Sequence, residues 1–409
     1  MRILYLSQYF PPEVGATQTR AYEMAQGLLK AGHSVTMIAE FPNHPHGIIP
    51  PEYQGKWYER ATLDGIDILR VWVKASPVKS FRSRMAFYLS YMVMATLAGL
   101  FLARGKYDAI YATSPPLFVG GAALLISYLR RLPLFFEVRD LWPESAIALG
   151  ELKNPRAIRL AIKLEEACYH RARRVIVTTQ EMATHLVSRG FEASHFQVIH
   201  NGANTDLFQF SAAERHRLRT ELGLNKKFVV GYAGLLGIAQ GLESVLNTAH
   251  QLEQQDASIF FLLIGDGPEK AKLQAKAAEM QLSNIHFLPS QPRQAIPGYL
   301  SAADVVLVPL ISQRLIGALP SKMFDAMACK RPVILSAAGE ATTILHEADA
   351  GLILPPQDSK ALCQALMLLK QDDDKREKYG ENGRSVTVKK YSRQAQAQEL
   401  TQLLSNTLS

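Results

Sequence analysis

The stretch GALPSKMFDAMACKRPVIL, residues 317–335, contains a loop, a helix and a strand in close succession. A glycine opens the loop, Pro320 starts the helix, and the last residues are apolar enough for a buried strand. Ser321 and Lys322 fall in the first helical turn, where backbone N–H groups and the helix dipole can hold a phosphate. Asp325 lies on the same helix face, where its carboxylate could accept hydrogen bonds from ribose hydroxyls. The stretch predicts a nucleotide-diphosphate site, with a capped surface helix as the alternative.

Short apolar segments alternate with helical segments on both sides of this stretch, a pattern typical of doubly wound parallel sheets. In the first half we predict strands at residues 2–7, 34–40, 66–73, 107–113, 132–138, 174–179 and 196–200. In the second half we predict them at residues 228–234, 258–265, 285–289, 304–310, 331–336 and 350–355. The glycine- and asparagine-containing segment NGANTDLF, residues 201–208, interrupts the series and is typical of a linker. The chain is thus predicted to be α/β, with two Rossmann-like domains facing a central cleft.

Length and composition agree with two globular domains. The chain has 409 residues, of which 48% are hydrophobic and 20% charged. Its three cysteines are scattered and lack the spacing of a metal site or a disulfide framework, so a reducing cytoplasm is expected. The short apolar run at the N-terminus is predicted to be a strand and not a signal peptide.

The positive charge is concentrated in the first half. Residues 1–205 hold 23 Lys+Arg against 16 Asp+Glu, a balance of +7, whereas residues 206–409 hold 22 against 21, a balance of +1. Such a field suits nucleic acid, an anionic membrane or a phosphate-bearing substrate. The sequence contains no zinc spacing, aromatic RNA-binding signature or helix-turn-helix pattern, so a nucleic-acid partner is not expected.

Two loops that follow predicted strands contain glycines suited to phosphate binding. In residues 8–20, Gly15 permits close backbone approach and Arg20 enters the next helix. In residues 231–244, Gly237 lies among four glycines, and Gln240 could donate from its amide to a diphosphate. Glycines that serve only tight turns are the alternative for both loops.

A third loop, residues 137–145 (EVRDLWPES), contains four ionisable residues and a tryptophan at the end of a strand. The ionisable residues are Glu137, Arg139, Asp140 and Glu144. A tryptophan face can stack against a sugar ring, and grouped acids at a strand end are candidates for catalysis. A structural Arg–Asp pair is the alternative.

Taken together, these motifs resemble the GT-B glycosyltransferases, and within them the family 4 enzymes of bacterial surface polysaccharide synthesis. The resemblance covers nearly the whole chain, through PPEVGA, RDLWPES, HNGANTDLF, GYAGLLGIAQG, LLIGDGPEK, GALPSK and YSRQAQAQELTQLL. It is strongest toward L-N-acetylfucosamine transferases of O-antigen and capsule assembly. It implies an acceptor-binding domain over residues 1–203 and a nucleotide-sugar-binding domain over 204–390, with a C-terminal helix at about 391–409 packing back on the first.

The resemblance also implies which residues bind the donor. The sequence departs from the family pattern in two places, and both departures change this assignment. The two glutamates that family 4 enzymes usually carry correspond here to Gly317 and Asp325, so Asp325 is expected to bind ribose and Glu340 to replace the missing acid. Lys322 becomes the main cation for the diphosphate, because Leu235 and Gln240 stand near the positions of the usual arginine and lysine. The full set of predicted donor contacts is Gly15, Arg20, Gly237, Gln240, Pro320, Ser321, Lys322, Asp325 and Glu340.

For catalysis, the resemblance implies Asp140 as the principal carboxylate, with Arg139 orienting it and Glu144 as a further candidate, because the family histidine is absent after residues 107–113. Transfer is expected to need no metal and no cofactor, and to retain anomeric configuration. The implied partners are a nucleotide sugar, with UDP as the expected carrier, and a polyprenyl-diphosphate-linked saccharide. A UDP-sugar epimerase of the same fold and a catalytically inactive scaffold subunit are the alternative functions.

Residues 85–103 form an uncharged run of 19 residues, about as long as a bilayer is thick if helical. Basic residues flank both ends of the run, which gives no inside–outside asymmetry. Three interpretations are open, namely a spanning helix, a buried helix, and a helix resting on the cytoplasmic leaflet. We favour the third, and therefore expect a cytoplasmic protein in peripheral contact with an anionic membrane.

Overall fold

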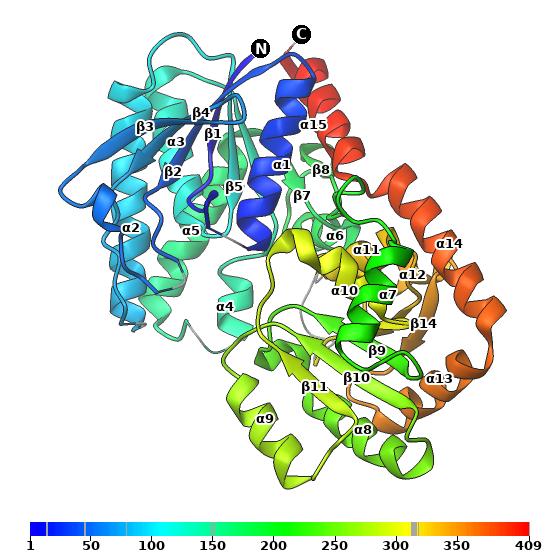
Figure 1. The fold of residues 1–409 in the computed structure, drawn as a ribbon. Helices are drawn as coiled ribbons and strands as arrows, with labels where there is room; N and C mark the ends of the chain where they lie inside the picture. Colours follow the sequence, from blue (N-terminus) through cyan, green and yellow to red (C-terminus); the bar gives the residue numbers. More distant parts are fainter. Residues whose placement is uncertain are drawn as a thin grey trace. The chain divides into compact units, whose positions relative to one another are not determined.

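The computed structural model describes residues 1–13, 15–44, 46–78, 80–148, 150, 152–311, 317 and 319–408. The chain divides into an N-terminal unit, Met1–His200 with Gln396–Ser409, and a C-terminal unit, Asn201–Ala395 (Figure 1). The chain passes from the N-terminal to the C-terminal unit after His200, three residues before the predicted boundary at residue 203. Most of helix α15 (Arg393–Leu408), from Gln396 onward, belongs to the N-terminal unit.

The N-terminal unit contains a sheet in which the described residues form eight strands, in the order β3-β4-β2-β1-β5-β6-β7-β8. Neighbouring strands are parallel, except that β3 is antiparallel to β4. The strands are β1 (Arg2–Leu6), β2 (Ser34–Glu40), β3 (Tyr58–Leu63), β4 (Ile66–Val71), β5 (Ala109–Ser114), β6 (Leu134–Val138), β7 (Ala172–Val177) and β8 (Phe196–Val198). The sequence analysis missed β3, because this edge strand buries no residue fully and its sequence YERATL is largely polar.

Helices cover both faces of this sheet. One face packs against α2 (Phe81–Leu97), α3 (Phe118–Arg130), α5 (Pro155–Arg171) and α6 (Gln180–Ser188), and the other against α1 (Ala16–Lys30) and α15. Alternate strand residues therefore serve different cores, so that Leu4 joins the α2 side while Tyr5 joins the α1 side. The C-terminal helix packs on the N-terminal unit through Ala397, Leu400 and Leu404.

The C-terminal unit contains a wholly parallel sheet, whose described strands follow the order β11-β10-β9-β12-β13-β14. They are β9 (Phe228–Ala233), β10 (Ile259–Ile264), β11 (Ile285–Leu288), β12 (Val305–Pro309), β13 (Val333–Ser336) and β14 (Gly351–Leu354). Each lies within a segment predicted as a strand. The inner strands β9, β10, β12 and β13 are largely buried on both faces, so they appear in the sequence as continuous apolar runs, whereas the edge strands β11 and β14 are partly exposed.

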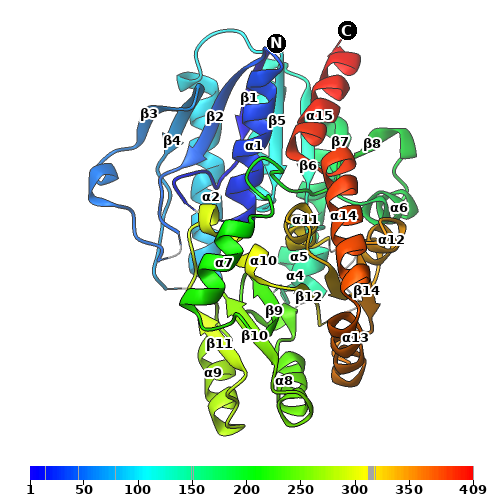
Figure 2. The same cartoon turned by 45° about the vertical axis from the view of Figure 1, so that its right-hand side comes forward.

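The helices of this unit again form two layers (Figure 2). Helices α10 (Ile296–Ala302), α11 (Ser321–Ala328) and α12 (Glu340–Glu347) contribute to one core, and α8 (Glu243–Gln255), α9 (Lys270–Glu279) and α13 (Ser359–Gln371) to the other. Helix α7 (Ala212–Glu221) packs on α10, and α14 (Asp373–Lys390) packs on α11. Several helices begin at a side-chain cap, for example Ser211 accepting from the N–H of Glu214.

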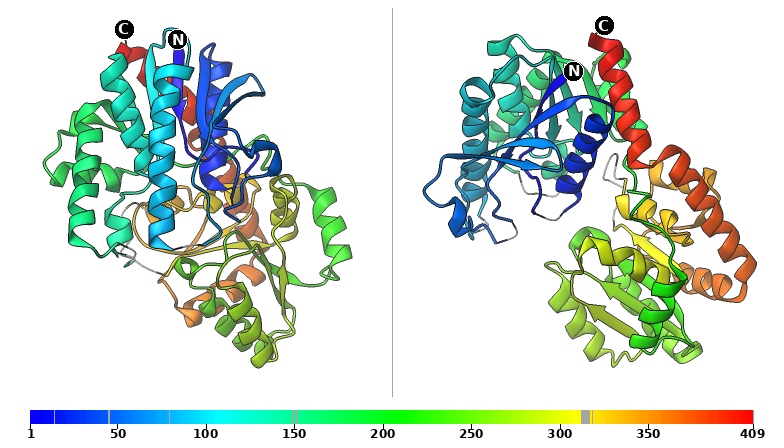
Figure 3. Two further views of the ribbon diagram at one scale, coloured as in Figure 1. Left: turned by 90° about the vertical axis from the view of Figure 1, so that its left-hand side faces the viewer. Right: turned by 45° about the horizontal axis from the view of Figure 1, so that its top comes forward.

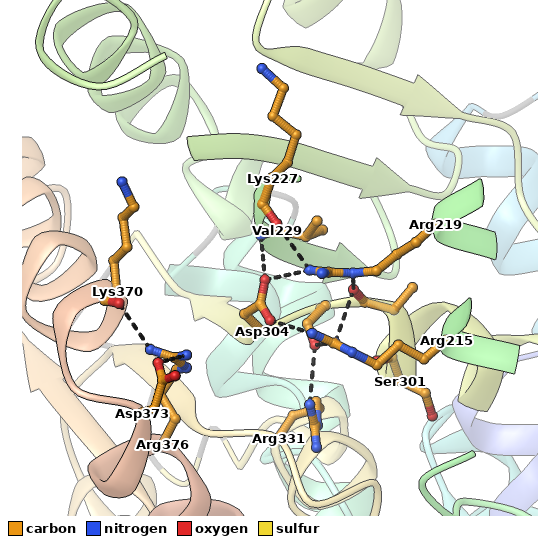
Figure 4. Close-up of polar contacts among 12 residues, drawn as sticks. Arg215, Arg219, Lys227, Val229, Ser301, Asp304, Arg331, Lys370, Asp373 and Arg376 are labelled. Atoms are coloured by element: carbon orange, nitrogen blue, oxygen red, sulfur yellow. Dashed lines mark hydrogen bonds and ion pairs between the residues drawn. The ribbon is translucent and has the colours of Figure 1, made fainter. Parts of the chain in front are cut away.

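Figure 4 shows an arginine cluster at the amino end of β12. Arg215 and Arg219, both on α7, form ion pairs with Asp304, which also accepts from the N–H of Val229 at 2.7 Å. The Arg215 side chain further donates to the carbonyls of Ser301, Ala302 and Ala303, which end α10. Cations at a helix C-terminus are favoured by the helix dipole, so the cluster joins α7, α10 and the sheet. It lies at the opposite end of the strands from the ligand-binding edge expected for this fold.

Helix α2 and the following turn η2 (Ala98–Leu102) form a 22-residue apolar helix, Phe81–Leu102, on the outer side of the N-terminal sheet (Figure 3). By length and composition it could cross a membrane, with a mean hydropathy of 1.8. Tyr91 and Ala95 are buried against the sheet, but only 28% of the most apolar 18-residue segment of this helix is buried. The buried and exposed faces show that α2 is a crossover helix of the sheet that leaves apolar side chains exposed.

Candidate functional site

The strand order of the C-terminal unit identifies its ligand-binding edge. The chain proceeds from β9 to β10 on one side and from β12 to β13 on the other, so the order reverses between β9 and β12. Ligands of such sheets bind beyond the carboxyl ends of the strands at this reversal. The loop after β12 leads to α11, which begins at Ser321 directly after Pro320, as predicted. No side chain in the described part of the chain caps this helix start.

Lys322, in the first turn of α11, lies at the reversal beside β9. Its Nζ donates to the Tyr232 hydroxyl at 2.8 Å and lies 4.4 Å from the centre of that ring. The Tyr232 hydroxyl in turn donates to the carbonyl of Leu235 at 2.6 Å. Burial lowers the pKa of Lys322 to about 8, and the nearby Asp325 carboxylate offsets part of that effect. A cation that is poorly hydrated and held at a helix start is suited to a phosphate ligand.

The glycines of the neighbouring loops allow these elements to approach one another. A Cβ atom on Gly234 would lie 3.1 Å from Lys322 Nζ, and one on Gly265 would lie 1.9 Å from the Gly234 carbonyl oxygen. Both glycines have positive φ, 151° for Gly234 and 149° for Gly265. The loops after β9 and β10 therefore pack backbone against backbone at these two glycines.

The other predicted donor contacts of this unit lie along the same edge. Gly237 precedes the short turn η4 (Ile238–Gln240), and the Gln240 Oε1 atom is buried with no hydrogen-bond partner within the described residues. Asp325 follows Lys322 by three residues on α11, and Glu340 begins α12 directly beyond β13. Gly317 has a φ of 71°, and residues 312–316 and 318 lie outside the described residues.

In the N-terminal unit, Asp140 follows β6 at the carboxyl edge of the sheet. Its Oδ2 accepts a hydrogen bond from the Ser145 hydroxyl at 2.9 Å. Burial raises the pKa of Asp140, and the Ser145 hydrogen bond and the Arg139 charge oppose this rise. The sequence analysis had assigned orientation of Asp140 to Arg139, whereas the structure places Ser145 in direct contact. Arg139 instead donates to the Ser114 carbonyl at 3.3 Å.

Arg20 lies in the core of the N-terminal unit and not on a ligand-accessible surface. It is 1% exposed, and its Nη2 forms an ion pair with Glu137 at 2.7 Å. It also donates to the carbonyls of Ile199 and His200. Burial raises the pKa of Glu137, but the Arg20 and Arg139 charges outweigh it and the pKa is about 2. The structure therefore removes Arg20 from the predicted donor contacts, because its charge is already neutralised and it braces β6 to the end of the unit.

Two further predicted residues have neighbours that the sequence did not indicate. Glu144 begins the short helix α4 (Glu144–Ala148), and its carboxylate is 3.0 Å from Arg189 Nη1. This ion pair supports a structural role for Glu144. Gly15 directly precedes α1, where a Cβ atom would lie 2.5 Å from Gln18 Oε1. The Gly15 backbone is extended, and the neighbouring atom is the end of a flexible side chain, so neither a left-handed conformation nor rigid packing requires glycine there.

Trp142, predicted from the sequence to face a sugar, belongs to an aromatic row at the same edge whose other members, Tyr88 and Phe118, sequence reasoning missed. The Tyr88 and Phe118 rings are stacked with centroids 5.8 Å apart, and Phe118 and Trp142 are 6.1 Å apart. Tyr9 joins the row, since burial and then the neighbouring Tyr88 raise the pKa of Tyr9. These residues come from α2, from the start of α3 and from the loops after β1 and β6, so their adjacency is set by strand order and was hidden in the sequence.

A buried acid pair was also missed. Glu40, the last residue of β2, accepts from Gln8 Nε2 at 2.7 Å and from Asn43 Nδ2 at 2.8 Å. Glu13 accepts from the N–H groups of Asn43 and His44. Burial, followed by the Glu13 charge, raises the pKa of Glu40 well above its usual value. The pair fixes the loop after β2 beside the aromatic row.

The described residues contain no group of three or more His, Cys, Asp or Glu side chains that could hold a metal ion. The three cysteines are free and buried.

Two protein families match successive parts of the sequence. Residues 15–202 match the family described as "Glycosyl transferase 4-like domain", and residues 214–386 match "Glycosyl transferases group 1". These matches coincide with the N-terminal and C-terminal units.

Individual relatives agree with these matches. WcaI of Escherichia coli (strain K12), named as a colanic acid biosynthesis glycosyl transferase, is 26% identical over 392 residues, covering 92% of this chain and 95% of WcaI. WbjE of Pseudomonas aeruginosa, named as a glycosyltransferase, is 26% identical over 254 residues, covering 60% and 63%.

Solved structures have the same fold. Anabaena HepE in complex with UDP and glucose has a TM-score of 0.74 at 20% identity, covering 98% of this chain and 99% of HepE. WaaG, a glycosyltransferase involved in lipopolysaccharide biosynthesis, has a TM-score of 0.73 at 15% identity, covering 98% and 99%.

Proposed function

Because this chain belongs to the group 1 glycosyltransferases and is a hexosyltransferase-type enzyme of the GT-B fold, we propose that it uses a UDP-linked sugar. In this proposal the sugar is transferred to a polyprenyl-diphosphate-linked saccharide during surface polysaccharide synthesis. The relatives WcaI and WaaG, whose names refer to colanic acid and lipopolysaccharide, support the polysaccharide assignment. An N-acetylated deoxyhexosamine such as L-N-acetylfucosamine is the proposed sugar, from the resemblance of the motifs.

The observation that carries the proposal is the position of Lys322 at the sheet reversal, beside Tyr232 and Gly234. In the proposed complex, the diphosphate takes the place next to the Lys322 ammonium and the N–H groups at the start of α11. Both interactions stabilise negative charge, and that charge grows on the diphosphate as its bond to the sugar breaks. Lys322 and the helix start can therefore assist departure of UDP without a metal ion.

Bond changes define what the acceptor side must do. The acceptor hydroxyl oxygen forms a bond to the anomeric carbon, while the bond from that carbon to the phosphate oxygen breaks and its electron pair leaves with UDP. The hydroxyl proton must be accepted in the same process. We assign that role, or stabilisation of positive charge at the anomeric carbon, to Asp140. Ser145 positions its carboxylate through the 2.9 Å hydrogen bond.

The acceptor saccharide is proposed to bind along the aromatic row. Trp142 lies two residues beyond Asp140, and its ring is followed by those of Phe118 and Tyr88. Aromatic faces offer apolar contact to sugar rings, and Tyr88 belongs to the apolar helix α2. Exposed Leu89, Val93 and Leu97 on α2 would contact the cytoplasmic face of the membrane that holds the lipid carrier.

The proposal is tested by incubating purified protein with UDP-linked and GDP-linked sugars, including UDP-L-N-acetylfucosamine, with and without a polyprenyl-diphosphate-linked saccharide. The expected result is release of UDP together with addition of the sugar to the lipid. The transfer rate should neither rise when Mg²⁺ is added nor fall when a chelator is added. Conversion of one UDP-sugar into its epimer without acceptor would identify an epimerase. Absence of turnover with every donor would favour a scaffold subunit.

A further inference from the structure

The N-terminal unit contains a cavity of about 430 Å³ at the amino ends of its strands. Its volume is in the range of small-molecule pockets. Residues at the start of β1, β2 and β4, on β3 and before β5 line it, so it lies at the opposite edge of the sheet from Asp140. The cavity is therefore separate from the candidate catalytic site.

Three arginines give this cavity its chemistry. Arg2, Arg60 and Arg104 line it, and Asp67 is the acidic residue among its lining residues. The Arg2 guanidinium donates to the Arg104 carbonyl at 2.9 Å and lies 4.7 Å from the centre of the Tyr107 ring. Arg60 donates to the Leu102 carbonyl. Among the described residues these arginine side chains form no ion pair with a carboxylate, so their charges and most of their donors are available to an anion.

The hollow results from a change of side chains along one face of the sheet. Leu69 and Ile38 on this face belong to the core under α2, whereas Thr36, Thr62 and Asp67 occupy the end of the same face. The helix ends at η2 above these residues, and the chain then turns toward β5 through Arg104. Polar side chains thus line the space that the helix no longer covers.

The cavity adjoins the exposed end of the apolar helix. Phe101 on η2 is 74% exposed and Leu97 is 43% exposed, and Arg104 follows within one turn. Leu125 and Leu129 near the end of α3, which packs on α2, are also exposed. An apolar surface beside an open cationic cavity matches a phospholipid, whose acyl chains and charged phosphate are separated in the same way.

We propose that this cavity binds the phosphate headgroup of an anionic glycerophospholipid while Leu97 and Phe101 contact the acyl-chain boundary. This inference rests on the proposed membrane contact of α2 and adds a specific headgroup site to it. Arg60 and Arg104 contact the phosphate in this arrangement, and Arg2 is held in place by Tyr107 and the Arg104 carbonyl. The site would orient the N-terminal unit on the membrane independently of the reaction.

Calorimetric titration with monomeric dihexanoyl phosphatidylglycerol tests the inference directly. The lipid should bind saturably, and Arg60→Gln combined with Arg104→Gln should weaken binding at least about tenfold, because both cationic contacts to the phosphate are lost. Thr62→Glu, which adds a carboxylate to the cavity and removes no arginine, should have a similar effect. Lys153→Gln combined with Arg173→Gln removes the same charge from exposed positions outside the cavity and should leave affinity unchanged.

Two comparison ligands separate the sources of the phosphate. Dihexanoyl phosphatidylcholine and inorganic phosphate should each bind at least about tenfold more weakly than the anionic lipid, since each lacks part of the recognised chemistry. Equal binding of inorganic phosphate would overturn the lipid assignment, and no saturable binding of phosphatidylglycerol would overturn the site itself. Neither failure would contradict the proposed function, because that function is tested separately by donor turnover and vesicle flotation.

Discussion

At the scale of single residues, substitution of Lys322 is the most direct test of the proposed donor site. Lys322→Ala should reduce the affinity for UDP by about 2 kcal/mol, roughly 30-fold, because a charge-assisted contact to the diphosphate is lost. Isothermal titration calorimetry measures the change. Lys276→Ala, which removes a lysine paired with Glu243 on the same unit, is the control and should bind UDP normally. Unchanged UDP affinity in Lys322→Ala would contradict the proposed phosphate site.

The same lysine predicts a pH dependence of UDP affinity. Its pKa of about 8 means that it is mainly charged at pH 7 and mainly neutral at pH 9. Only the charged form attracts the diphosphate, so the affinity should fall as the pH rises above about 8, and binding should be accompanied by proton uptake. Titrations between pH 7 and 9.5 in buffers of different ionisation enthalpy measure both effects. The dependence should disappear in Lys322→Ala, and a constant parental affinity over this range would refute it.

Asp140 provides the corresponding test on the acceptor side. Asp140→Asn should lower kcat about a hundredfold or more and leave UDP affinity nearly unchanged, because it removes a charge needed only for the reaction. Steady-state rates at saturating acceptor, together with UDP titration, separate the two effects. Turnover close to the parental value would show that Asp140 is structural.

Ser145→Ala distinguishes positioning of Asp140 from a merely structural contact. The Ser145 hydroxyl stabilises the charged carboxylate and so lowers its pKa. Without that hydrogen bond the pKa should rise, and the acid limb of the kcat profile should move to higher pH. Ser145→Thr, which retains a hydroxyl, should restore the parental profile.

At the scale of secondary structure elements, the arginine cluster at β12 shows how α7 and α10 are held to the sheet. Asp304→Asn should destabilise the C-terminal unit by about 3 kcal/mol, since Arg215 and Arg219 lose their shared carboxylate while partly buried. All three tryptophans, Trp57, Trp72 and Trp142, lie in the N-terminal unit, so hydrogen exchange of β9 and α7 peptides is the suitable measurement.

Glu221→Gln serves as the control for this prediction. Glu221 pairs with Arg217 on the exposed face of α7, with both side chains about half exposed. Exposed pairs contribute little, so exchange in β9 should remain parental. Equal protection of β9 in Asp304→Asn and Glu221→Gln would show that the cluster does not stabilise the unit.

At the scale of the whole molecule, the apolar helix predicts membrane association. The protein should float with vesicles that contain anionic lipid at low salt and be released at high salt, because its basic residues attract the surface while a spanning helix would not be released. Neutralising Arg82, Arg84, Arg104 and Lys106 together should abolish flotation. Failure of the parental protein to float at low salt would rule out a membrane-resting α2.

The alternation of strands and helices could be predicted from the sequence, and with it the two Rossmann-like units and the helix start at Pro320. These features depend on residues close in the chain, since burial on both faces requires continuous apolar runs and helix starts have local preferences. β3 escaped prediction because an exposed edge strand needs no apolar pattern.

Contacts between distant residues were decided only by the tertiary structure. Arg20 and Lys322 are both cations near helix starts, yet Arg20 meets Glu137, 117 residues away, and Lys322 meets the Tyr232 hydroxyl, 90 residues away. The first contact neutralises the charge in a core, and the second leaves an ammonium that, among the described residues, has no carboxylate bond at the sheet reversal. Strand order determines both outcomes, because it selects which strand ends become neighbours, and periodicity along the chain contains no information about that order.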